Sequence, residues 1–103
     1  MTTTPVEAPS PEVQIVEVDA TGSALLAVVV RCLATTRLHA CFRHTTPDGK
    51  AVDLVLAEIL RYPQVPVDEV DPPHGARLVF TGEGADDLRL KPGDILRGTN
   101  PTS

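Results

Sequence analysis

The stretch that decides the fold is ALLAVVVRCL, residues 24–33. It contains three consecutive valines, Val28 to Val30, and β-branched residues favour strands because their side chains pack well on a pleated surface. Apolar residues fall on both faces of the stretch, which is typical of a strand that is buried on two sides. This stretch therefore predicts a β-strand that is buried on both faces.

Polar and apolar residues alternate over the next segment, residues 38–44, as expected for a strand with one buried face. The simplest pairing is an antiparallel hairpin with the first strand. A register that sets Val30 opposite Phe42 would place Arg31 beside Cys41 on the outer face. The sequence thus predicts a basic outer face as the candidate partner-binding surface, made of Arg31, Arg37, His39 and Arg43.

A strong turn signal, TPDGK at residues 46–50, separates this strand from the next segment. Residues 51–62 fit two structures. Their apolar positions have the spacing of an amphipathic helix, yet Val52, Leu54 and Leu56 also alternate as in a strand. The pattern alone leaves both open. Further short strands are predicted at residues 13–18, 76–81 and 95–96, each bounded by glycine or proline turns.

The composition supports one small domain with an aliphatic core. The chain has 103 residues, of which 42% are hydrophobic but only 3% aromatic. Ten prolines and seven glycines disfavour long helices. We predict an all-β domain, a small closed antiparallel barrel of about six strands, over residues 13–98. Residues 1–12 and 99–103 are predicted to be disordered tails, because they are polar and rich in proline or follow the last strand.

Charge and motifs exclude several classes of function. The net charge is -5, and only residues 21–50 carry a positive local balance, of +3, so general nucleic-acid binding is disfavoured. No apolar run approaches the ~20 residues of a membrane span. No secretory signal opens the chain, and two cysteines are too few for a disulfide scaffold. We therefore expect a cytoplasmic protein that does not associate with a membrane. There is no P-loop for a nucleotide, and we expect no cofactor. Seven arginines against two lysines favour a GC-rich, bacterial source.

Two constellations could carry chemistry. Cys32, His39, Cys41 and His44 supply metal-ligand types within thirteen residues, although no Cys-x-x-Cys pair is present. Cys41 could also act as a thiol nucleophile with His39 on the same strand face as its base. The simpler interpretation, which we prefer, makes both cysteines small apolar core residues. We therefore expect no catalytic residue and no metal ligand.

Three motifs stand close together late in the chain: GARLVFTG at residues 75–82, DDL at 86–88 and GDIL at 93–96. Together they resemble the closing half of the second domain of translational GTPases, the elongation factor Tu family, and the similarity extends over about residues 24–97. The resemblance implies a small closed β-barrel, and it favours a strand at residues 51–62. The family's glycines in the first hairpin and its GTPase domain have no counterpart in this chain.

The resemblance implies a stand-alone, non-catalytic module that binds a partner. In the family this barrel packs on the GTPase domain and helps to hold tRNA or contacts the ribosome. We expect a protein partner first, with RNA or the ribosome as a second choice. Two alternatives remain: the thiol enzyme, and a PDZ-like peptide-binding module suggested by LKPGDIL at residues 90–96 followed by Asn100.

Overall fold

The computed structural model describes residues 10–101, and nearly all of its regular structure is β-strand. Within that range no helix is long and apolar enough to cross a membrane. The elements are β1 (Glu12–Thr21), β2 (Leu25–Ala34), β3 (Thr36–Arg37), β4 (Cys41–Thr45), β5 (Ala51–Arg61), β6 (Val65–Val67), β7 (Glu69–Val70), β8 (Gly75–Thr81), the short 3₁₀ helix η1 (Ala85–Leu88) and β9 (Ile95–Thr99).

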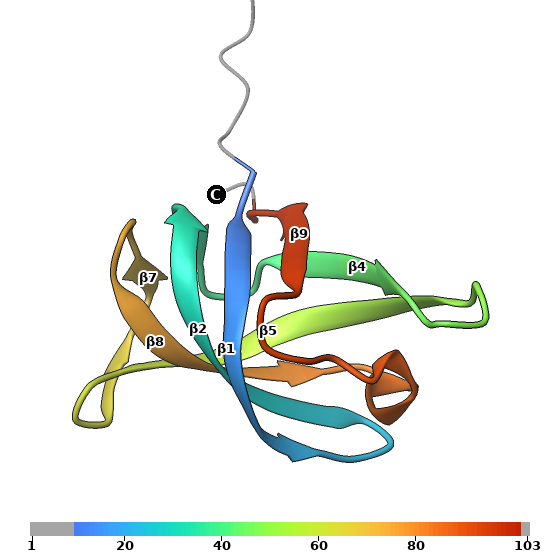
Figure 1. Cartoon of the computed structure of the whole chain (residues 1–103). Coiled ribbons are helices and arrows are strands. Elements are labelled where there is room, and N and C mark those ends of the chain that lie inside the picture. Colours follow the sequence, from blue (N-terminus) through green and yellow to red (C-terminus); the bar gives the residue numbers. More distant parts are fainter. Residues whose placement is uncertain (1–9, 102–103) are drawn as a thin grey trace, which may run out of the picture.

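Six antiparallel strands close into a barrel, which confirms the predicted fold class (Figure 1). The strand order is β4-β9-β1-β2-β8-β5, and a second pairing of β4 with β5 closes the ring. Strand β6 adds to β5 beyond the ring, and β3 pairs with β7 in a separate two-stranded sheet. Because the ring is closed, each of its six strands is paired on both sides. Among residues 10–101 only β6 adds to this sheet outside the ring, and it carries Pro66, which has no N–H to offer a further strand.

Alternation along each strand fills the barrel with aliphatic side chains. On β5, for example, Val52, Leu54 and Leu56 are buried while the residues between them are exposed. The two phenylalanines meet edge to face inside the barrel, with ring centroids of Phe42 and Phe80 5.2 Å apart and planes at 83°. Bulges in β1 and β5 let these long strands bend around that core.

The predicted strand at residues 51–62 is confirmed, but the predicted hairpin between residues 24–33 and 38–44 is wrong. β2 is paired on both sides, by β1 and by β8, so it has no edge left for β4. β4 pairs instead with β5, which follows it after a tight turn, and with β9. The continuous strand predicted for residues 38–44 is interrupted at His39, whose φ of 74° separates β3 from β4, although exposed and buried residues still alternate through the segment.

The strands extend past both predicted boundaries of the barrel. Strand β1 begins at Glu12, and β9 runs to Thr99, so the end placed at residue 98 falls inside a strand. Asn100, predicted to lie in a tail, is buried: its Nδ2 donates to the carbonyl of Thr35 at 3.0 Å, and its Oδ1 accepts from the backbone N–H of Arg37 at 2.9 Å. Of the other predicted tail residues, 10, 11 and 101 are described and Pro11 is buried, whereas 1–9 and 102–103 lie outside the described part of the chain.

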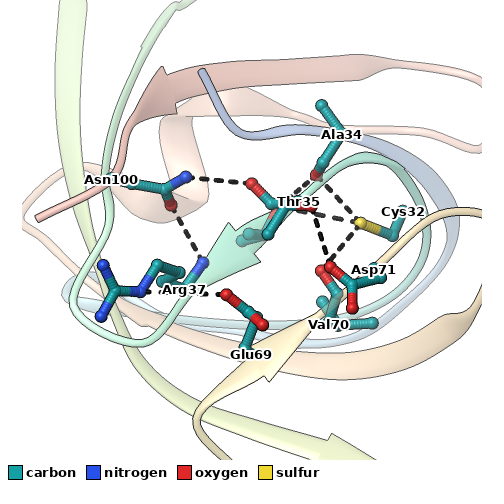
Figure 2. Close-up of polar contacts among 9 residues, drawn as sticks. Cys32, Ala34, Thr35, Arg37, Glu69, Val70, Asp71 and Asn100 are labelled. Atoms are coloured by element: carbon teal, nitrogen blue, oxygen red, sulfur yellow. Dashed lines mark hydrogen bonds and ion pairs between the residues drawn. The ribbon is translucent and has the colours of Figure 1, made fainter. Parts of the chain in front are cut away.

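Figure 2 shows that these bonds belong to a polar network around β3 and β7. The Thr35 hydroxyl donates to Asp71 at 2.8 Å, and Arg37 pairs with Glu69 at 3.9 Å. The Cys32 thiol lies 3.3 Å from the carbonyl of Val70, and burial raises the pKa of this thiol. The network therefore ties the segment after β2 both to β7 and to the segment after β9.

We expect Asn100→Ala to destabilise the protein by about 2 kcal/mol, because two backbone groups of the segment 35–37 would lose their buried partner. Urea unfolding followed by circular dichroism would measure the loss. Thr99→Ala is the matched control, since Thr99 is the exposed neighbour and should leave the midpoint nearly unchanged. Equal midpoints for the two variants would contradict a structural role of the Asn100 amide.

Candidate binding groove

A groove of about 540 Å³ lies on the outside of the barrel, where β2, β8 and β5 run side by side and the loop from β5 to β6 projects past them. Hydrogen-bonded register places its central residues in one row: Arg77 of β8 lies between Val29 of β2 and Leu60 of β5. The lining residues are Glu17, Asp19, Val29, Leu60, Arg61, Tyr62, Gln64, Gly75, Ala76 and Arg77.

The floor of the groove is apolar because the outer face of the sheet carries aliphatic residues here. Val29 and Leu60 face outward and remain half-buried, although outward positions of a barrel are normally polar. Gly75 has no side chain to fill the space, so the groove remains deep at this position. A Cβ at this position would come 3.3 Å from the carbonyl oxygen of Val30, which indicates how close β2 and β8 approach.

One wall of the groove is the tip of the β5–β6 hairpin. Tyr62 is 95% exposed, and Val65 on the same hairpin is 51% exposed. The tip is tight: the N–H of Gln64 donates to the carbonyl of Arg61 at 2.7 Å. An aromatic side chain held out in water beside an apolar floor is the arrangement that interfaces use for their central contacts.

The opposite wall comes from β1. Asp19 is the extra residue of a bulge between Val18 and Ala20, and the bulge directs its carboxylate to the groove. Its Oδ2 accepts from Nε of Arg77 at 3.0 Å, and both side chains are about one-third exposed. This ion pair neutralises the two charges at the centre of the groove.

Two arginines near the groove have no ion-pair partner among residues 10–101: Arg61, which lines it, and Arg31. Arg31 is two residues beyond Val29 on the same face of β2, and its register partner is Gly75 of the groove floor. Glu17 is an acidic residue of the lining, and it has no ion-pair partner within the described chain. The charge left uncompensated at the groove is therefore positive, in a chain of net charge -5.

The four residues predicted as one basic surface do not lie together. Arg31 is on β2, whereas Arg43 is on β4, three strands away in either direction around the ring. Arg43 donates to Asp53 at 2.7 Å, and this contact holds the pKa of the Asp53 carboxyl below its usual range. Arg37 belongs to the β3–β7 sheet and pairs with Glu69, and His39 lies in the turn that follows.

The candidate thiol site is also rearranged. Cys41 is exposed, which corrects the expectation of a core cysteine, whereas Cys32 is buried as predicted. The Cys41 thiol contacts the backbone carbonyl of His39 at 3.9 Å, and no contact within residues 10–101 joins it to the imidazole. Over the same range no three His, Cys, Asp or Glu side chains lie close enough to hold a metal ion.

Two signals in the sequence pointed to the groove without being interpreted that way. The run VVV at residues 28–30 puts a valine on the outer face, and Tyr62, the single tyrosine, is followed directly by Pro63. For the PDZ-like alternative, the described chain offers no α-helix; its helical element is η1, four residues long. No known family model matches the chain, and no curated protein matches it.

Proposed function

We propose that this chain is a non-catalytic β-barrel module that binds a protein partner through the groove beside the β5–β6 hairpin. The observation that carries the proposal is Tyr62, which stands 95% exposed beside the apolar floor of Val29 and Leu60. An exposed aromatic side chain next to an apolar groove is a typical feature of protein-binding sites. The groove is partly open to solvent, so a polypeptide segment can reach it from outside.

The proposal includes a similarity to the second domain of elongation factor Tu. Its support is the closed six-stranded antiparallel barrel, together with the motifs at residues 75–82 and 93–96, which fall on β8 and at the start of β9. As a fold-level likeness it suggests a module that acts by docking. The groove, rather than the scattered set of Arg37, His39 and Arg43, is the docking surface we propose, and Arg31 alone of the predicted set borders it.

Photo-crosslinking tests the proposal. With p-benzoylphenylalanine in place of Tyr62, we expect a specific cross-linked protein in the source cells, because the side chain is exposed at the groove wall. The same amino acid in place of Thr45, which is exposed on β4 across the barrel, serves as the matched control and should give no such product.

The cross-linked protein is then identified, purified and titrated against the chain. We expect Tyr62→Ala to weaken its binding by about thirtyfold, the effect of losing a central aromatic contact. His44→Ala, a substitution on β4, should leave the affinity unchanged. Equal affinity of the wild type and Tyr62→Ala, or cross-linking at position 45 alone, would refute the groove as the binding site.

A further inference from the structure

We infer that the segment bound in the groove is acidic and extended, with an apolar side chain placed between two carboxylates. This inference rests on the proposed function and adds the chemical class of the partner. Its basis is the charge pattern of the groove. Arg77 at the centre is paired with Asp19, whereas Arg31 and Arg61 have no ion-pair partner in the described chain.

The two arginines are separated by a distance that an extended segment can bridge. Arg31 is on β2 and Arg61 at the end of β5, and these strands lie on either side of β8. Neighbouring strands are about 4.8 Å apart, so the two positions are separated by about 10 Å across the sheet. An extended chain rises about 3.3 Å per residue, so carboxylates about three residues apart would reach both guanidinium groups.

The apolar floor adjoins both arginines. Val29 is two residues before Arg31 on the same face of β2, and Leu60 and Arg61 both line the groove at the end of β5, so a side chain between the two carboxylates would lie next to Val29 and Leu60. Burying that side chain excludes water, which strengthens the charge pairs at the rim. Tyr62 covers the hairpin side of the same segment.

A single-stranded nucleic acid is the competing anionic ligand, and the groove is poorly suited to it. Glu17, which has no ion pair among residues 10–101, lines one wall, and a phosphate backbone with a charge on every nucleotide would be repelled there. Tyr62 is the one aromatic side chain of the lining, whereas such binding uses a series of stacked bases. A peptide can place its carboxylates at the two arginines and keep neutral residues opposite Glu17.

The test uses a displayed library of random twelve-residue peptides selected on the full chain. We expect selected peptides to carry two acids about three residues apart around an aliphatic or aromatic residue. Their affinity should fall about tenfold for Arg31→Glu and for Arg61→Glu, since each change replaces an attraction by a repulsion. Arg43→Glu, the matched control on β4, should change the affinity less than twofold.

The outcomes separate this inference from the proposed function. Neutral or basic peptides that bind the wild type and are lost with Tyr62→Ala would refute the acidic class but keep the peptide-binding groove. Peptides whose affinity is unaffected by Tyr62→Ala would refute both. Displacement of the acidic peptide by a twelve-nucleotide single-stranded RNA at equal concentration would overturn the inference in favour of a nucleic acid. Self-association through the groove, detected by sedimentation and abolished by Tyr62→Ala, would overturn it in favour of a second copy.

Discussion

Gly98→Ala is expected to destabilise the barrel by about 3 kcal/mol, the upper part of the range for overpacked sites. Gly98 lies on β9 opposite Phe42 of β4, in one of the six strand pairings that make up the ring. A Cβ at this position would overlap the backbone oxygen of Cys41 and would come 2.9 Å from Cγ of Phe42. Backbone cannot move aside without breaking the β4–β9 pairing, so the clash is relieved only by opening the ring.

Urea unfolding measures this effect, and Gly22→Ala is the matched control. Gly22 lies before β2, and a Cβ added to it would have no neighbouring atom within 4 Å, so alanine there should leave the midpoint unchanged or raise it slightly. A Gly98→Ala protein that unfolds at the same urea concentration as Gly22→Ala would contradict the close approach of β4 and β9.

Phe80→Ala is expected to lose about 4 kcal/mol of stability, because it removes one of the two aromatic rings that fill the barrel. Phe80 is fully buried on β8, and its ring meets Phe42 edge to face. Small domains have total stabilities of about 5–15 kcal/mol, so the variant should be close to its unfolding transition at about 37 °C. Thermal and urea unfolding measure the loss.

The exposed aromatic supplies the control for this prediction. Tyr62→Ala removes a side chain of similar size that is 95% exposed, and it should change the stability by less than about 0.5 kcal/mol. A double-mutant cycle of Phe42→Leu and Phe80→Leu should show a coupling of about 1 kcal/mol, as edge-to-face rings do. Additive losses would indicate that the two rings contribute through burial alone.

Most of the strands could be predicted because the barrel obeys local rules. Alternation and turn residues predict the strand at residues 76–81, which is β8, without knowledge of the rest of the chain. For residues 51–62 the pattern alone leaves helix and strand open, and only the family resemblance favours the strand that β5 forms. Pairing is a different matter. The sequence of residues 24–44 does not indicate that β2 pairs with β1 on one side and with β8 on the other. It also does not indicate that β4 pairs with β9, which is more than fifty residues away.

The groove could not be predicted because its residues come together only through that pairing. Val29, Arg77 and Leu60 are far apart in sequence and share a row through two registers. The prediction of one basic surface assumed that residues 24–33 and 38–44 form a hairpin. Because they do not pair, the four predicted residues lie on different parts of the barrel. The facing of each residue was nevertheless predicted correctly: Arg37, His39 and Arg43 are exposed, while Ala40 and Phe42 are buried.

The closure of the ring by β9 has a consequence for how the chain reaches this structure. β9 pairs with β1, the first strand, and with β4, so it joins parts of the chain made at very different times during translation. Without β9, the facing edges of β1 and β4 would be unpaired and the apolar interior would be open on that side. Burial of the interior thus depends on a contact between residues more than fifty positions apart, and such long-range pairings predict slow folding for a domain of this size.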